Sequence, residues 1–185
     1  GIRPDIMTIA KGLSSGYQPI GGSVVSDEVA QVMGSTEFNH GYTYSGHPVA
    51  AAVALENLRI MQDEKIVEHV RNVAAPALKQ GLESLADHPL VGEVNIAGMM
   101  GSLPLTPHKE SRAKFASERG TIGSIGRDRA FANNLIMRHV GDRMIVSPPL
   151  IMSEEDIEVL ITRARKTLDE TYQIAKDEGL LKAAS

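Results

Sequence analysis

Residues 5–22 read DIMTIAKGLSSGYQPIGG, an apolar segment that ends at one lysine and is followed by small residues. The apolar positions predict a short strand over residues 5–10, and residues 20–25 predict a second strand. Lys11 would then stand at the carboxyl end of a buried strand, the edge at which open α/β sheets bind their ligands. The glycines and serines after Lys11 would let another molecule come close to the backbone.

Lys11 has an ordinary interpretation and a chemical one. Most lysines that follow a strand are solvated surface charges. A lysine that loses its proton by desolvation is instead a nucleophilic amine, which can form a Schiff base with a carbonyl compound. Pyridoxal phosphate is the commonest carbonyl cofactor held in this way, so Lys11 is a candidate for binding it.

The composition is that of a globular protein and argues against several classes of function. The chain has 185 residues, 42% of them hydrophobic and 23% charged, enough for a sizeable core. The formal net charge of -4 gives no basic surface for nucleic acid. No apolar run approaches the roughly 20 residues of a membrane span, and no signal-peptide pattern is visible, so we expect no membrane partner. The sequence has no cysteine, which excludes disulfides and a cysteine nucleophile and fits a reducing compartment, so we expect a cytoplasmic protein.

Turn and cap residues predict two unequal pieces. Ser26 is a plausible N-cap for a short helix, and Pro48 stands where a long helical stretch should begin. We expect Pro76 to kink or interrupt this stretch. We also expect a domain boundary within it, with residues 1–60 in one domain and residues 61–185 in a small α+β domain.

The second piece shows its own sequence of elements. Ser153 and Asp156 form a capping box that predicts the start of a last helix, whose apolar stripe is Ile157, Leu160, Ile161, Ala164 and Leu168. Before it we expect a glycine-containing hairpin over residues 90–107, an exposed polar segment over 109–120, a helix over 125–134, and strands over 135–138 and 143–147.

Two further stretches carry candidate binding residues. In HGYTYSGHP, residues 40–48, the N–H groups of Tyr42 and Thr43, the Thr43 hydroxyl and the following helix start could hold a phosphate; the ordinary interpretation is a tight turn with packed tyrosines. Arg138 ends a predicted strand and could bind a substrate carboxylate, with Arg143 a weaker candidate; the ordinary interpretation is a solvated charge near a hairpin.

Other motifs are missing. Gly120, Gly123 and Gly126 recur every three residues but do not make GxGxxG, and no Walker A loop is present. The six histidines are scattered and none is spaced for a zinc helix, so we expect no metal site.

Three long stretches together resemble the class III, or ω-type, aminotransferases. They are PDIMTIAKGLSSGYQPIGG, FNHGYTYSGHPVAAAVALENL and NNLIMRHVGDRMIVSPPL, in the family's order. The closest likeness is to the amine– and diamine–pyruvate transaminases. The resemblance implies an α/β chain with the fold of type I pyridoxal-phosphate enzymes, in which residues 1–60 end the large cofactor-binding domain and residues 61–185 form the small carboxyl-terminal domain.

The resemblance also implies a role for each candidate. Lys11 matches the lysine that forms the Schiff base with pyridoxal phosphate and then moves a proton on the substrate. Thr43, with Tyr42 beside it, matches the threonine that binds the cofactor phosphate in the neighbouring subunit's site, so a homodimer or higher oligomer is implied. Arg138 matches the mobile arginine that binds the carboxylate of a keto acid. The implied reaction moves an amino group from a primary amine or ω-amino acid to a keto acid, with pyruvate as the expected acceptor.

The chain also departs from the family. Members run to more than twice this length, and before the lysine they carry an aspartate for the ring nitrogen, an aromatic that stacks on the ring and a phosphate loop. None of these is in the 185 residues, so we expect a carboxyl-terminal part of a transaminase that is inactive by itself. Two alternatives stay open: an aminomutase, epimerase or decarboxylase of the same class, and a non-catalytic dimerisation module.

Overall fold

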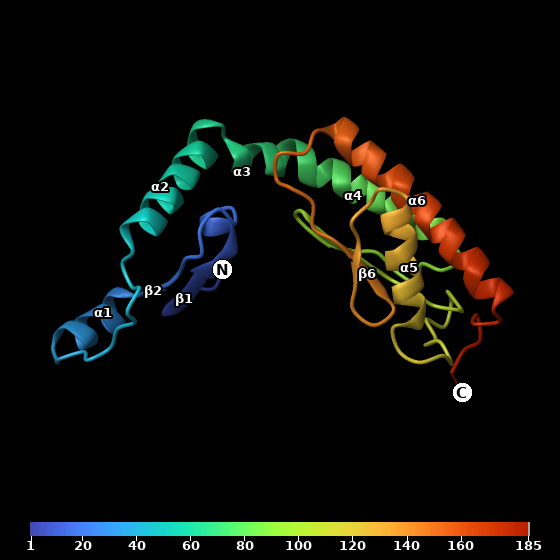
Figure 1. Cartoon of the computed structure of the whole chain (residues 1–185), viewed down its shortest axis with the longest axis horizontal. Coiled ribbons are helices and arrows are strands. Elements are labelled where there is room, and N and C mark those ends of the chain that lie inside the picture. The colour runs from blue at the N-terminus through green and yellow to red at the C-terminus, as the bar shows by residue number, and fades with distance from the viewer. Residues whose placement is uncertain (185) are drawn as a thin grey trace. The chain divides into compact units, whose positions relative to one another are not determined.

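The computed structural model describes residues 1–184 and divides them into two compact units (Figure 1). The N-terminal unit is Gly1–Lys65, and the C-terminal unit begins at Ile66. The long helix α2 (Pro48–Asp63) ends at this boundary, where Lys65 takes a left-handed backbone conformation with φ of 53° that an α-helix does not allow.

The helical stretch therefore ends at Lys65. At Pro76, where we expected a kink or an interruption, the helix has only a π-helical irregularity. After the break the path runs through α3 (Ile66–His69), the π-helical turn η2 (Val70–Ala74) and α4 (Ala75–Glu83). A proline inside a helix has no N–H to donate and its ring crowds the carbonyl one turn earlier. A widened π turn directly before Pro76 relieves both problems, so the helix passes the proline without ending.

The N-terminal unit contains one small antiparallel sheet and two helices. Strand β1 (Ile6–Ala10) leads through the 3₁₀ turn η1 (Lys11–Leu13) to strand β2 (Gly21–Val25), with Ile6 opposite Val25 and Ala10 opposite Gly21. Helix α1 (Asp27–Gly34) follows, and the Ser26 hydroxyl accepts a bond from the Val29 N–H as its N-cap. Pro48 opens α2 as its sequence position predicts.

The apolar residues of β1 and β2 are only partly covered. Ile6 is 58% exposed and Val24 49%, and Ile9 is half-buried. These apolar faces are thus exposed, as the small number of strands in residues 1–60 predicts, because β2 is the only strand beside β1 within residues 1–184.

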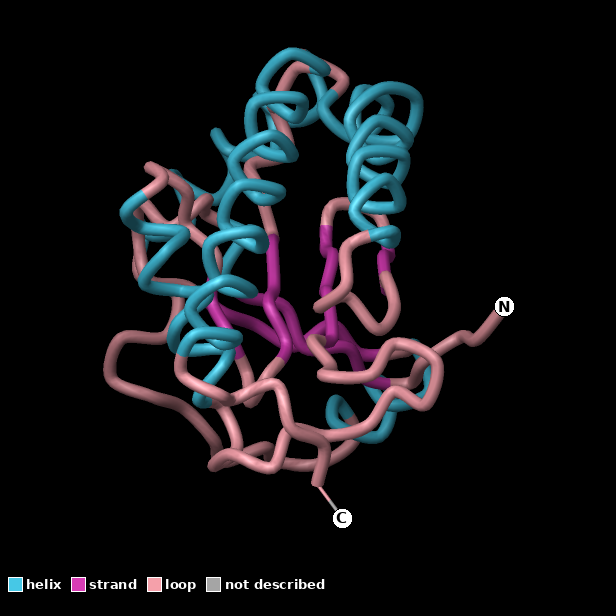
Figure 2. The backbone as a smooth tube through the Cα atoms, turned by 90° about the vertical axis from the view of Figure 1, so that its right-hand side faces the viewer, coloured by secondary structure: helices cyan, strands magenta, loops and turns pink. Residues whose placement is uncertain are grey.

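The C-terminal unit is built on a four-stranded antiparallel sheet, seen in magenta in Figure 2. Its order is β3 (Asn95–Ala97), β4 (Met100–Pro104), β6 (Arg143–Val146) and β5 (Arg138–His139). One face is buried through Gly101, Leu103, Met144 and Val146. The α4 helix packs on this face by placing Leu82 over Gly101. Gly98, with φ of 58°, makes the tight turn of the β3–β4 hairpin that the glycines predicted.

Helix α6 (Glu154–Asp177) follows the sequence prediction closely. Ser153 and Asp156 form the capping box, with the Asp156 N–H donating to the Ser153 hydroxyl at 3.1 Å. Its predicted stripe faces the core: Ile157, Leu160, Ala164 and Leu168 are buried and Ile161 is half-buried. Core side chains from α4 join them, so α6 is fixed by burial along its length.

Helix α5 (Thr121–Ala132) starts four residues earlier than we expected, because its cap is remote. The Asp142 carboxylate, from the turn between β5 and β6, accepts bonds from the N–H groups of Gly120, Ile122 and Gly123 at 3.0–3.1 Å. Gly123 lies so close to this turn that a Cβ atom there would stand 2.2 Å from the Gly141 carbonyl oxygen. The glycines of α5 thus allow close packing of the helix against the turn between β5 and β6.

Candidate functional site

The residues around Lys11 form a strained turn. Lys11 is exposed and has φ of 51°, a left-handed conformation that costs an L-residue roughly 1–2 kcal/mol. Glycine or asparagine would adopt it more easily, so the backbone is strained at the lysine. Lys11 and the strand β1 before it are both exposed. Residues 1–184 therefore do not supply the desolvation that we expected around this amine.

Two side chains that sequence reasoning missed hold this turn. The Ser14 hydroxyl is 2% exposed and donates to the Gln18 carbonyl at 2.5 Å. From α2, the Asn57 side-chain NH2 donates to the carbonyl oxygens of Gly12 at 3.0 Å and Leu13 at 3.1 Å. Asn57 lies 46 positions after Lys11, and only the repeat of small residues after the lysine hinted that something would approach the backbone there.

The loop before α2 is arranged differently from the predicted phosphate cradle. The Tyr42 N–H donates to the Ser45 hydroxyl at 3.2 Å, and the Ser45 N–H donates back to the Tyr42 carbonyl at 2.9 Å. The Tyr42 N–H is thus already used within the loop. Among the hydrogen bonds of residues 1–184, none engages the N–H or the hydroxyl of Thr43, so Thr43 keeps both groups for a ligand.

The two tyrosines of this loop do not pack into a core. Tyr42 is 74% exposed and makes an edge-to-face contact with the His40 ring, with ring centres 4.9 Å apart, and Tyr44 is similarly exposed. Together with residues 18–21 and the start of α2, they line an open hollow of about 580 Å³. The ordinary interpretation of the tyrosines as packing residues is therefore wrong.

The Lys11 turn and Thr43 are attached to different parts of α2. The turn is bound to Asn57, whereas Thr43 precedes the helix start at Pro48. At about 1.5 Å per residue, Asn57 lies about 14 Å along the helix axis from Pro48. The segment that follows the turn, residues 18–21, lines the same hollow as Tyr42 and Tyr44.

Arg138 belongs to the C-terminal unit. It lies on β5, where it stands opposite Ile145 of β6, and its side chain is exposed. No ion pair of Arg138 occurs in the part of the chain that the structure describes, and the same holds for Arg143. Both guanidinium groups are therefore available to an anion. Separately, no group of His, Asp and Glu side chains suited to a metal ion occurs within residues 1–184.

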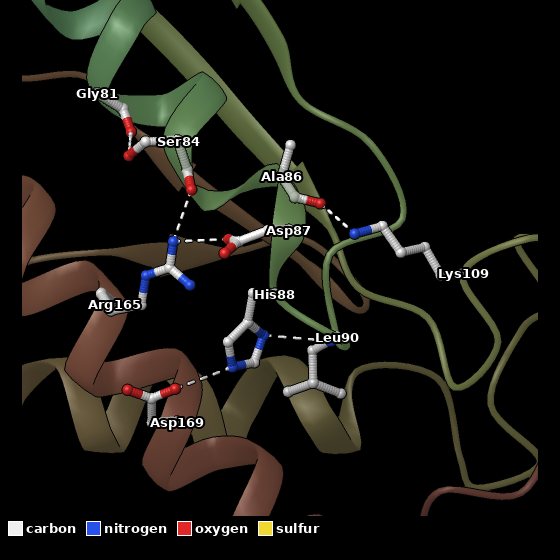
Figure 3. Close-up of polar contacts among 9 residues, drawn as sticks. All are labelled: Gly81, Ser84, Ala86, Asp87, His88, Leu90, Lys109, Arg165 and Asp169. Carbon is white, nitrogen blue, oxygen red and sulfur yellow. Dashed lines mark hydrogen bonds and ion pairs between the residues drawn. The ribbon is translucent and has the colours of Figure 1, made fainter.

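The C-terminal unit also contains a buried histidine that the sequence did not reveal (Figure 3). The His88 side chain is 3% exposed; its Nδ1 accepts from the Leu90 N–H at 3.2 Å, and its Nε2 lies 3.3 Å from the Asp169 carboxylate. Burial lowers the pKa of His88, with the Arg165 charge adding to this, although Asp169 acts in the opposite direction. Arg165 in turn donates to Ser84 and Asp87, both at 2.6 Å, and holds the pKa of Asp87 below its usual value.

The His88 network joins helix α6 to the end of α4, and its imidazole is buried. His88, Asp87 and Ser84 come from the segment after α4, and Arg165 and Asp169 come from α6. Lys109 donates to the Ala86 carbonyl from a third segment. We interpret this network as structural.

Comparison with known proteins connects these features. Residues 1–168 match the family model described as aminotransferase class-III. The putrescine–pyruvate aminotransferase of Pseudomonas aeruginosa is 54% identical over 172 residues, which are 92% of this chain and 37% of that protein. The chloroplastic gamma aminobutyrate transaminase 3 of Solanum lycopersicum is 40% identical over 175 residues, covering 92% of this chain and 33% of that protein.

Solved structures agree in fold. An (S)-enantioselective ω-transaminase from Thermomicrobium roseum has a TM-score of 0.86 and 39% identity over 92% of this chain and 38% of its own. A thermostable ω-transaminase mutant from Pseudomonas jessenii has a TM-score of 0.84 and 38% identity, over 93% of this chain and 39% of its own. The expected α/β fold, that of part of a type I pyridoxal-phosphate transaminase, is confirmed, and the chain spans less than half the length of these relatives.

Proposed function

Since the chain belongs to the class-III aminotransferase family, we propose that the protein carrying it transfers an amino group from a primary amine or ω-amino acid to a keto acid. Pyruvate is the proposed acceptor and a diamine the first donor to test, because the relative with 54% identity is a putrescine–pyruvate aminotransferase. In that protein residues 1–60 would end the large domain and residues 61–185 would form the small one. This family match is the observation that carries the proposal.

The residues present suit pyridoxal phosphate as cofactor. Lys11 offers an exposed amine, and Thr43 offers an N–H and a hydroxyl that bind nothing else among residues 1–184. Gly12 and Gly46, beside these two residues, have no atom within 4 Å of the position of an added Cβ, so both backbones are open to a ligand. When bound, pyridoxal phosphate withdraws electrons from the substrate carbon that bears the amino group.

Each side chain then has a proposed task. Lys11 Nζ would hold the cofactor and would act as the group that moves the proton at the reacting carbon. The Thr43 hydroxyl and N–H, with the Tyr42 segment and the positive end of α2 beside them, bind phosphate. The Arg138 guanidinium binds the carboxylate of the keto acid, where its planar fork gives two parallel bonds.

A homodimer is part of the proposal, because the resemblance to class III aminotransferases implies that Thr43 serves the cofactor site of a second copy. A cytoplasmic location also belongs to the proposal, and the sequence without cysteine is compatible with it. Within residues 1–184 no helix is long and apolar enough to cross a membrane.

The function is tested with the full-length protein and pyruvate as acceptor. Putrescine, β-alanine, taurine and an aromatic amine are compared as donors, with alanine formation as the measurement. Lys11→Ala should lower kcat by about 10²- to 10⁴-fold, the usual contribution of a proton-transferring group. Lys65→Ala is the control, because Lys65 is another exposed lysine of the same unit with a left-handed backbone. Unchanged alanine formation in Lys11→Ala would contradict the proposal.

The shared site is tested by mixing two inactive variants. Lys11→Ala and Thr43→Ala chains, unfolded and refolded together, should recover about a quarter of wild-type activity, because half of the dimers are mixed and each mixed dimer has one intact site. If Thr43 acts within its own chain, mixing restores nothing.

A further inference from the structure

We propose that Asn57 is a positioning residue for Lys11, a role that rests on the proposed function of this lysine. The Asn57 side chain comes from α2 and donates to the carbonyl oxygens of Gly12 and Leu13 at 3.0 and 3.1 Å. These carbonyls belong to the two residues directly after Lys11. Asn57 therefore fixes the backbone from which the lysine side chain extends.

The chemistry of the contact requires an amide at this position. Both acceptors are carbonyl oxygens, so the NH2 end of the asparagine, and not its oxygen, must face them. One NH2 group carries two hydrogens and can serve the two carbonyls at once. Neither an aliphatic side chain nor an ionised carboxylate of the same size can replace these bonds.

The Lys11 turn depends on such an outside contact. Ser14 and Tyr17 make shorter bonds further along the turn, but the two bonds to the carbonyls of Lys11 and Gly12, from the N–H groups of Ser14 and Ser15, are both long at 3.3 Å. The lysine itself holds an unfavourable left-handed conformation, and β1 before it is poorly covered. Asn57 supplies the side-chain hydrogen bonds that join α2 to this turn among residues 1–184.

Loss of the contact should let the turn relax and displace Lys11 Nζ. A reacting group displaced by about 1 Å can lose about a hundredfold in rate. The expected defect lies in the chemical step, because Asn57 touches neither of the groups proposed to bind phosphate and carboxylate. A residue with a purely structural role would lower stability without changing the environment of the lysine amine.

The test compares Asn57→Leu with Gln62→Leu in the full-length protein. Gln62 lies on the same helix, is exposed, and its side chain makes no hydrogen bond among the described residues. In the cofactor-free protein, Asn57→Leu should speed hydrogen exchange of the amides at 14–17, and Gln62→Leu should not. In the holoenzyme, bound pyridoxal phosphate gives a yellow absorbance band, and Asn57→Leu should shift the pH midpoint at which this band changes. The same variant should lower kcat by about tenfold or more, with KM for pyruvate nearly unchanged.

Asn57→Asp serves as the second variant if Asn57→Leu does not fold, because it keeps the size and removes the N–H donors. It should likewise speed hydrogen exchange at 14–17, shift the pH midpoint of the band and lower kcat. The positioning role is overturned if both Asn57 variants keep the wild-type hydrogen exchange at 14–17, the wild-type pH midpoint of the band and the wild-type kcat. In that case the proposed function still stands if the band disappears in Lys11→Ala. A band and an activity that persist in Lys11→Ala would overturn the proposed function itself.

Discussion

The two units differ in how much apolar surface they bury. The C-terminal unit buries a continuous set of side chains from its sheet and from α4, α5 and α6. The N-terminal unit buries few apolar side chains, yet it carries Lys11 and Thr43. The side chains proposed to hold the cofactor thus lie where the local structure buries few apolar groups, so we expect their geometry to depend on single contacts such as that of Asn57.

The largest expected difference appears when the two units are made separately. Residues 66–185 should unfold in one cooperative transition, because they contain the core cluster. Residues 1–65 should show no such transition, because the sheet of β1 and β2 is only two strands wide. Circular dichroism on heating measures both, and a cooperative transition in residues 1–65 would break the comparison.

The tight packing of α5 gives the next effect. In Gly123→Ala the new methyl group would meet the Gly141 carbonyl oxygen at 2.2 Å and His139 Nδ1 at 2.8 Å. Overpacking of this kind costs about 3 kcal/mol of the free energy of unfolding of the C-terminal unit. Urea denaturation is the measurement. Gly34→Ala, at a position with nothing within 4 Å, should leave that free energy unchanged.

The same change in one cap of each unit sharpens the contrast. Ser153→Ala removes the capping box of α6 and should lower the free energy of unfolding by about 1 kcal/mol, because α6 is part of the core. Ser26→Ala removes the cap of α1, a helix without a buried residue, and should leave the unfolding of the C-terminal unit as it was. Equal losses in the urea transition would argue that the units are not independent.

The smallest expected effect is a pH dependence confined to the C-terminal unit. Burial lowers the folded-state pKa of His88, so between that pKa and the usual value the unfolded chain binds more protons. Stability is then complete above about pH 6.5 and falls as the pH drops below it, by at most about 1.4 kcal/mol per pH unit for one proton.

Urea denaturation at pH 5 to 8 measures this slope, with His88→Gln as the reference. An amide at this position cannot titrate, so the difference between the two proteins isolates His88 from the other five histidines. If wild type and His88→Gln give parallel profiles of stability against pH, His88 has the same pKa in the folded and unfolded chain.

Local signals in the sequence predicted the elements that depend on neighbouring residues. The capping box at Ser153 and the hairpin glycine Gly98 each act within a few positions, so their patterns are visible in the sequence. Features made by distant residues were not visible. Asp142 caps a helix that begins about 20 positions earlier, and Asn57 reaches a turn more than 40 positions away. The exposure of β1 was predictable in another way, because residues 1–60 contain too few strands to make a closed sheet.

The length of α2 has one more consequence. Successive residues of an α-helix are rotated by about 100° about its axis, so one residue inserted between Pro48 and Asn57 would turn the asparagine away from the Lys11 turn. Seven inserted residues would restore its direction but move it by about 10 Å along the axis. The interval from Pro48 to Asn57 should therefore tolerate changes of residue type more readily than changes of length.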